Sequence, residues 1–241
     1  MNYSLLWKEF HKEFSQHYTD EFSLLEYLEK SQYTYIPLEV KDKGKETLGD
    51  ILTKLELRKH VPKDGAHFSK TSGTTGIPVA VTKTPEAMLW FAATNLRELL
   101  WRKWDLSKLV VSILARFTKD RMTDLIYEKK LDTIKNLQKF LEKVQPYYLY
   151  TYPSIIQLLD LSKLKKLIDI KSVGEVGATN YSSEETGTIA LRCPDSKEEI
   201  YHIMENIIVE IDDIHGVVIT DLTNPLIKRY ALGDVVELGK D

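Results

Sequence analysis

Strand-like and helix-like segments alternate along the chain up to about residue 175, and only strand-like segments follow. Residues 109–115 form a continuous apolar run of the kind found in buried strands. Residues 85–104 have helical periodicity and begin with a proline, which is common in the first turn of a helix. Helical spacing also marks residues 121–143 and 154–168. This alternation predicts an α/β body, and the strands that follow predict a β-rich C-terminal part.

The remaining segments complete the predicted organisation. Residues 3–31 carry apolar side chains at helical spacing and predict one or two amphipathic helices packed on the larger body. The further strands that we expect are short: 79–82, 147–152, 170–177, 188–193, 200–203, 206–211, 216–222, 225–231 and 234–238. We therefore divide the chain into three ranges, namely N-terminal helices with a connection (1–68), an α/β nucleotide-binding core (69–187) and a β-rich subdomain (188–241).

Composition excludes several classes of protein. Lys and Arg total 33 against 36 Asp and Glu, a net charge of −3, so the chain lacks the basic excess of nucleic-acid-binding proteins. No apolar run approaches the ~18 residues of a membrane span, and the first residues mix charges among apolar positions, unlike a signal peptide. Cys193 is the only cysteine, which rules out an internal disulfide and fits a reducing compartment. We expect a soluble, cytoplasmic protein without nucleic-acid or membrane partners.

The segment Thr-Ser-Gly-Thr-Thr-Gly at 71–76 carries the strongest chemical signal. Glycines allow the backbone to turn tightly and present its N–H groups to an anion, and the hydroxyls add further donors. The segment therefore predicts a cradle for phosphate. It is not a Walker loop, because it lacks the lysine of that motif. The structural alternative is a polar, flexible loop between two elements.

The full string TSGTTGIP resembles the phosphate loop of the adenylate-forming enzymes, the acyl-CoA synthetase superfamily. Similar blocks follow in the family's order: YLYTYPS at 148–154, NYSSEETGTIALRCP at 180–194, YHIMENIIVEI at 201–211 and PLIKRYALGD at 225–234. They are most similar to the phenylacetate–CoA ligase-like branch. The resemblance implies a pared-down form of the family's large N-terminal α/β domain, with a β-rich subdomain at its end.

The resemblance also implies roles for individual residues. The loop that would close over the β- and γ-phosphates of ATP comprises Thr71, Ser72, Gly73, Thr74, Thr75 and Gly76. Tyr181 corresponds to the aromatic residue that stacks on adenine, and Glu185 to the glutamate that helps to hold Mg²⁺. Asp234 corresponds to the aspartate that binds the ribose hydroxyls, a task that suits a carboxylate because its lone pairs only accept. We assign catalytic roles to Glu185 and Thr75. We assign a third to Arg229, which we expect to contact phosphate.

Structural alternatives remain open for these residues. Tyr181 could be a core aromatic, Asp234 a turn residue, and Glu185 one of a solvated pair with Glu184. Arg229 could instead pair with a nearby acid.

Cys193 and His202 occupy positions at which some relatives hold zinc. Two ligands do not complete a tetrahedral zinc site, so we expect an ordinary thiol and an ordinary strand histidine.

The implied reaction is ATP-dependent activation of a small carboxylic acid, with CoA or another acceptor used afterwards. The stretch between Gly76 and Glu185 is shorter than in relatives, and the family's C-terminal domain, with its catalytic lysine, does not follow Asp234. Losing that lysine would be costly, because such transfers rely on charge stabilisation. A second interpretation therefore stays open: a non-catalytic nucleotide-binding relative, or one half of a split ligase that works with a separate C-terminal-domain protein or a carrier protein.

Overall fold

The structure is a computed structural model of the 241-residue chain, and it describes residues 20, 23–24, 26, 50–59, 68–70, 80–114, 134–196 and 199–236. The predicted phosphate loop, 71–76, lies outside the described residues. So do most of the predicted helical segment 3–31 and the first part of the predicted helix 121–143.

The chain forms two compact units, each assembled from separate stretches of sequence. Unit 1 comprises Met1–Arg97, Ser183–Ile189 and His202–Asp241, and unit 2 comprises Glu98–Ser182 and Ala190–Tyr201. Both units are discontinuous because helix α4 and strands β6, β7 and β8 each continue across the boundary between them. The three continuous ranges expected from the sequence (1–68, 69–187 and 188–241) follow the order of elements along the chain. Their status as domains stays a prediction.

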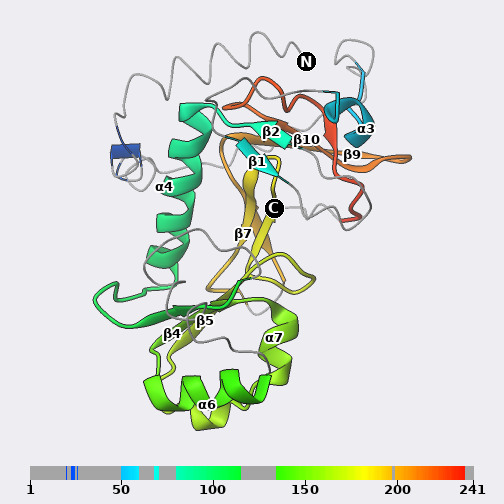
Figure 1. Ribbon diagram of the computed structural model, residues 1–241. Coiled ribbons are helices and arrows are strands. Elements are labelled where there is room, and N and C mark those ends of the chain that lie inside the picture. Colours follow the sequence, from blue (N-terminus) through cyan, green and yellow to red (C-terminus); the bar gives the residue numbers. More distant parts are fainter. Residues whose placement is uncertain are drawn as a thin grey trace. The chain divides into compact units, whose positions relative to one another are not determined.

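Unit 2 contains a parallel three-stranded sheet in the order β3-β4-β5. Its strands are β3 (Val110–Ser112), β4 (Tyr148–Thr151) and β5 (Asp169–Ser172). The helices that lie beside β4 and β5 in Figure 1 are α6 (Ile134–Val144) and α7 (Pro153–Leu158), with a short 3₁₀ helix, η2, at Leu161–Lys163. Parallel strands need such crossover connections, and here helices supply them.

The core of unit 2 lies between this sheet and α6. Leu137, Phe140 and Leu141 of α6 are three and four positions apart, so they share one face of the helix. They belong to a buried apolar cluster that also contains Val111, Leu149, Leu159 and Leu164. Burying one such side chain stabilises the fold by roughly 1.5–3 kcal/mol.

Unit 1 contains an antiparallel sheet in the order β11-β10-β9 and a separate two-stranded pair, β1-β2. The strands are β1 (Phe68–Lys70), β2 (Ala80–Thr82), β9 (Ile207–Asp212), β10 (Gly216–Asp221) and β11 (Tyr230–Ala231). The short helix α3 (Lys54–Leu57) begins at a capping box, in which the side chains of Thr53 and Glu56 satisfy each other's backbone N–H groups. Leu52 pairs with Tyr230 of β11 and so ties α3 to this sheet.

The elements that cross the unit boundary are α4 (Pro85–Trp101), β6 (Asn180–Ser183), β7 (Gly187–Arg192) and β8 (Tyr201–Ile203). The three strands form a sheet in the order β6-β7-β8. No helix within the described segments is long and apolar enough to cross a membrane.

The mixed α/β class expected from the sequence is confirmed, and so is the helix expected at 85–104, which is α4. The strand expected over 225–231 is wrong for most of its length, since only Tyr230 and Ala231 pair with β10. A turn replaces it because the side chains of Asp221 and Asn224 accept hydrogen bonds from nearby backbone N–H groups.

Two further expectations are corrected. Of the strand expected over 234–238, residues 234–236 are described and form no strand, although the Val217 N–H donates a hydrogen bond to the Asp234 main-chain oxygen. The helix expected over 154–168 ends at Leu158, where Leu159 adopts an extended backbone, and only η2 follows.

Candidate functional site

The turn that carries Glu184 and Glu185 lies beside the end of strand β2 in unit 1. Lys83 directly follows β2, and its Nζ atom donates a hydrogen bond of 2.5 Å to the main-chain oxygen of Glu185. These two residues are 102 positions apart in the sequence. Because β2 follows the Thr/Ser/Gly segment, this contact links the predicted metal-binding glutamate to the strand that leads out of the predicted phosphate loop.

The Glu185 side chain is buried, with 5% of the residue exposed. The Tyr230 hydroxyl donates to Glu185 Oε1 over 3.0 Å. Burial and the adjacent Glu185 carboxylate raise the pKa of Tyr230 above its usual value, so the phenol keeps its proton and remains a donor. Glu184, in contrast, is exposed. The alternative in which Glu185 belongs to a solvated pair is therefore wrong.

Lys83 supplies a positive charge to an otherwise acidic cluster. Burial lowers the pKa of Lys83, while the nearby charges of Asp221, Glu184 and Glu185 act in the opposite direction. The ammonium group thus offsets repulsion among carboxylates that lie close together in a region of low polarity.

Asp221, at the end of β10, is almost wholly buried, with 1% exposed. Its Oδ1 atom accepts hydrogen bonds from the Thr223 backbone (2.9 Å), the Thr223 hydroxyl (2.5 Å) and the Asn206 amide (3.2 Å). Among the described residues, Asp221 Oδ2 and Asn206 Oδ1 have no hydrogen-bond partner. Burial raises the pKa of Asp221 despite these hydrogen bonds and the Lys83 charge.

Two side-chain contacts hold the turn after β10 against the end of β2. Asn224 donates to the main-chain oxygen of Thr82 over 3.0 Å, and Thr84 donates to the main-chain oxygen of Thr223 over 2.7 Å. The Thr84 hydroxyl also accepts from the Ala87 N–H over 3.0 Å and so caps the start of α4. The region around Lys83 is therefore fixed on both sides.

Arg229 is buried and paired within the same unit. Its Nε atom lies 3.2 Å from Glu210 Oε2 on β9, and both residues are at most 9% exposed. Its backbone has φ of 49°, a left-handed conformation that is unusual for arginine. The ion pair that was the alternative for Arg229 is thus present, and a role at phosphate stays a prediction.

Asp234 lies on the exposed segment that follows β11. Its main-chain oxygen accepts a hydrogen bond of 2.9 Å from the Val217 N–H. The backbone of Gly216 approaches so closely that an added Cβ atom would lie 2.2 Å from the same oxygen. These contacts fix the backbone of Asp234 against the start of β10.

A cavity of about 540 Å³ opens beside this segment of unit 1. Its lining includes Lys54 of α3, Gly233 and Val235 on either side of Asp234, and the Asp212–His215 turn. His215 Nδ1 lies 2.9 Å from Asp212 Oδ1, and this contact with two backbone hydrogen bonds lowers the pKa of Asp212 to about 2. The cavity lies next to the predicted ribose-binding residue, and its lining is more apolar than polar.

Tyr181 belongs to unit 2, where it is half-buried on strand β6. The structure thus brings Lys83, Glu185 and Asp221 together in unit 1, with Arg229 and Asp234 elsewhere in that unit. The loop residues Thr71–Gly76 lie outside the described residues, so their role stays a prediction.

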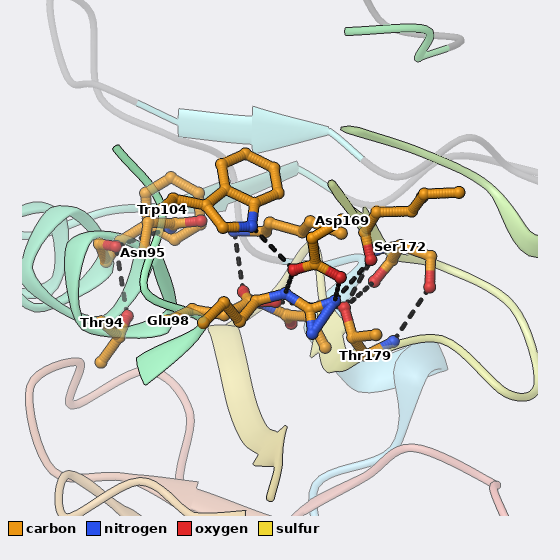
Figure 2. A network of polar contacts seen from close by, with 12 residues as sticks. Thr94, Asn95, Glu98, Trp104, Asp169, Ser172 and Thr179 are labelled. Atoms are coloured by element: carbon orange, nitrogen blue, oxygen red, sulfur yellow. Dashed lines mark hydrogen bonds and ion pairs between the residues drawn. The ribbon is translucent and has the colours of Figure 1, made fainter. Parts of the chain in front are cut away.

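A second polar network lies in unit 2, at the residues that lead into Tyr181. Figure 2 shows Glu98, Ser172 and Thr179 in this network, with Asp169 and Trp104 close by. Glu98 forms an ion pair of 2.7 Å with Lys171, and each of these side chains is at most 4% exposed. The Lys171 ammonium also lies 4.8 Å from the centre of the Tyr150 ring.

The carboxylate oxygens described in unit 1 could hold Mg²⁺ only together with oxygens of a bound substrate. Within the part of the chain that the structure describes, no group of three or more His, Cys, Asp or Glu side chains could hold a metal ion. Mg²⁺ is, however, commonly held by one or two carboxylates together with substrate phosphates. The buried carboxylate of Glu185 fits that arrangement.

Cys193 is a free, half-buried thiol, and His202 lies on β8. Our expectation that Cys193 and His202 bind no zinc stays a prediction.

Reasoning from the sequence missed Lys83, Asp221 and Tyr230. Tyr230 stands within the PLIKRYALGD block, which is the one signal that could have drawn attention to it. Nothing in the spacing of Lys83 or Asp221 indicates that they meet near Glu185, because that contact depends on how distant segments pack.

Comparison with protein-family models and with curated proteins found no match. Among solved structures, the chain resembles 2-hydroxyisobutyryl-CoA ligase in the postadenylation state with R3-HIB-AMP, with a TM-score of 0.54 and 16% identity over 75% of this chain and 52% of the ligase. The same ligase with 2-HIB-AMP and CoA, in the thioesterification state, gives a TM-score of 0.50 and 18% identity over 74% of this chain and 52% of the ligase. The chain therefore shares the α/β fold of a CoA ligase and spans about half of that enzyme's length.

Proposed function

We propose that the chain binds ATP with Mg²⁺ and activates a small carboxylic acid, as the core of an adenylate-forming, phenylacetate–CoA ligase-like enzyme. The observation that carries this proposal is the contact between Lys83 and the Glu185 backbone. It joins the block at 180–194 to the strand that follows the predicted phosphate loop, although the two residues are 102 positions apart in the chain. The fold shared with a CoA ligase supports the same conclusion.

In this proposal each block binds one part of the nucleotide. The N–H groups and hydroxyls of 71–76 hold the β- and γ-phosphates, Tyr181 stacks on adenine, and Asp234 accepts hydrogen bonds from the ribose. Glu185 holds Mg²⁺, which when bound neutralises charge on the departing phosphates. Tyr230 and Lys83 fix the Glu185 carboxylate and backbone, and so determine where that charge is held.

The reaction that we propose is an in-line displacement. A carboxylate oxygen of the acid forms a bond to the α-phosphorus, the bond between the α-phosphorus and the bridging oxygen breaks, and pyrophosphate leaves with that oxygen. The products are an acyl-adenylate and pyrophosphate. An acceptor thiol, such as that of CoA, would then displace AMP from the acyl carbon.

A second candidate is a nucleotide-binding protein without turnover, or one half of a split ligase whose C-terminal-domain protein or carrier protein is a separate chain. The burial of Arg229 against Glu210 favours it, because that pairing occupies a cation assigned to catalysis.

Carboxylate-dependent exchange of labelled pyrophosphate into ATP tests the proposal, with a panel of aryl and short-chain acids. We expect exchange in the wild type and its loss in Glu185→Ala and Thr75→Val. Glu184→Ala is the matched control, because this neighbouring glutamate is exposed and should retain most of the signal. ATP binding without exchange would support the non-catalytic candidate, and exchange that survives both site variants would refute the site assignment.

A further inference from the structure

Glu98 is a buried acid at the C-terminal end of α4 that the proposed reaction does not use. The residue is 3% exposed, and its carboxylate pairs with the equally buried Lys171 of β5 over 2.7 Å. A buried ion pair of this kind is weak evidence for stability, because desolvation offsets most of the attraction between the charges. Such a pair can instead fix the geometry of the elements that it joins.

The Glu98 carboxylate also accepts hydrogen bonds from residues at the start of β6. Thr179 donates its hydroxyl to Oε1 over 3.1 Å, and Asn180 donates its side-chain amide to Oε2 over 3.0 Å. Figure 2 shows how Thr179 lies between Glu98 and Ser172. Thr179 and Ser172 also exchange hydrogen bonds between their side chains and backbones, at 3.0 and 3.1 Å. One carboxylate thus joins α4, β5 and the entry to β6.

This link determines the direction of the next side chain. Asn180 is the first residue of β6, is 3% exposed and points its amide at Glu98. Successive side chains of a strand point to opposite faces, so Tyr181 faces away from Glu98. Fixing Asn180 consequently fixes the strand from which the Tyr181 ring projects.

We propose that Glu98, neutralised by Lys171, is a positioning residue that orients Tyr181 for stacking on the nucleotide base and so contributes to the preference for adenine. The consequence for base preference rests on the proposed function, whereas the mechanical link from Glu98 to Tyr181 does not. Stacking depends on the offset and tilt of the ring, and groups that bind must be held by neighbours whose own positions are locked.

The chain contains a matched control pair that joins the same two segments. Arg102 of the turn after α4 lies 3.1 Å from Asp169 at the start of β5, and Trp104 donates to Asp169 over 2.7 Å. Arg102 also donates to the main-chain oxygen of Ile170. These contacts tie the end of α4 to the start of β5, and none of them involves residues 178–181, although the Arg102 charge also acts on Lys171. Their loss should disturb unit 2 without disturbing Tyr181.

Three double variants of the full chain separate positioning from general destabilisation. Glu98→Leu/Lys171→Met removes the charges and the links to Thr179 and Asn180. Glu98→Gln/Lys171→Met keeps those links, because the amide oxygen can accept from Asn180 while the amide nitrogen donates to Thr179. Arg102→Met/Asp169→Leu is the control. Asn180→Ala provides a fourth variant that cuts only the final link, in case the first does not fold.

Hydrogen–deuterium exchange of the peptide covering residues 178–183, without ligand, measures the link itself. We expect roughly tenfold faster exchange there in Glu98→Leu/Lys171→Met and in Asn180→Ala, and rates near the wild type in the other two double variants. Calorimetric titration with Mg-ATP and Mg-GTP measures the consequence, and the ratio of their affinities should fall by roughly tenfold in the same two variants.

The exchange experiment and the titration can fail independently. A wild type that binds neither nucleotide refutes the proposed function, and hydrogen–deuterium exchange still decides whether Glu98 holds strand β6 in place. Unchanged exchange at 178–183 in a folded Glu98→Leu/Lys171→Met or Asn180→Ala variant overturns the positioning role. Faster exchange with an unchanged ATP-to-GTP ratio overturns the claim about base preference.

Discussion

Asp221 and Glu185 are buried acids near the same lysine, yet their hydrogen bonding differs. Glu185 receives a donor from Tyr230, whereas Asp221 leaves one oxygen without a partner among the described residues. Burial raises the pKa of Asp221, so the folded protein binds this proton more tightly than the unfolded chain does. The stability that this proton contributes is present below the unfolded pKa, 3.8, and is lost as the pH rises through the folded pKa.

Asp221→Asn should remove that pH dependence. The amide has the shape of the protonated acid, and its oxygen can still accept from Thr223 and Asn206. Urea unfolding at pH 5 and pH 8 measures the free energy of unfolding in both proteins. We expect the variant to gain stability relative to the wild type as the pH rises, although Lys83 loses a counter-charge. Parallel pH slopes in the two proteins would show that Asp221 does not bind the proton.

Tyr230→Phe should destabilise the protein by about 1–3 kcal/mol at neutral pH, because a buried carboxylate loses its donor. A double-mutant cycle with Glu185→Gln isolates the energy of this pair from other effects of either change. Tyr147→Phe is the control, since Tyr147 is half-buried and its ring, rather than its hydroxyl, faces Lys108 and Lys166. Equal free energies of unfolding for Tyr230→Phe and the wild type would contradict the proposed role of the hydroxyl.

The sequence predicts Glu185 and Asp234 as site residues because each stands in a block of recognisable order. It does not predict the partners that hold them. Lys83 and Tyr230 reach Glu185 only because β2, the turn at 184–186 and β11 meet in the folded chain. Local patterns carry no information about such long-range contacts.

Strand β10 begins at a glycine whose conformation matters for the site. Gly216 has φ of 68°, and an added Cβ atom would lie 2.2 Å from the main-chain oxygen of Asp234. Gly233 also has a positive φ, 83°, but a Cβ atom added there would meet no described atom within 4 Å. Alanine substitutions at these two glycines therefore distinguish the cost of backbone strain from the cost of displacing a neighbouring segment.

Gly216→Ala should cost clearly more stability than Gly233→Ala. Conformational strain applies to both and costs about 1–3 kcal/mol, whereas only the change at Gly216 must also move the backbone of Asp234. Guanidinium unfolding of both variants provides the comparison. Equal losses would mean that the approach of Gly216 to Asp234 does not constrain this segment.

Among the secondary-structure elements, those with long periodic patterns are the ones that the sequence predicts well. Helix α4 and strands β4, β7, β9 and β10 match their expected positions closely. The strand expected over 225–231 is mostly a turn, because Asp221 and Asn224 bind local backbone N–H groups in preference to a ladder. Apolar residues such as Ile227 fit either structure, so periodicity alone cannot choose between them.

For the chain as a whole, the α/β class follows from the alternation of segments, whereas the division into two discontinuous units does not. A continuous helix such as α4 belongs to both units, and no composition change marks the boundary within it.

Calorimetric titration of the chain with Mg-ATP, beside Asp234→Ala, tests nucleotide binding most directly, because it requires no knowledge of the acid. Asp50→Ala is the matched control, since Asp50 is another exposed aspartate of the same unit and does not line the cavity beside Asp234. We predict saturable binding to the wild type and to Asp50→Ala, and binding at least about tenfold weaker to Asp234→Ala, the cost expected for hydrogen bonds to a charged group. The absence of binding to the wild type, or equal affinity for all three proteins, would contradict the proposed nucleotide site.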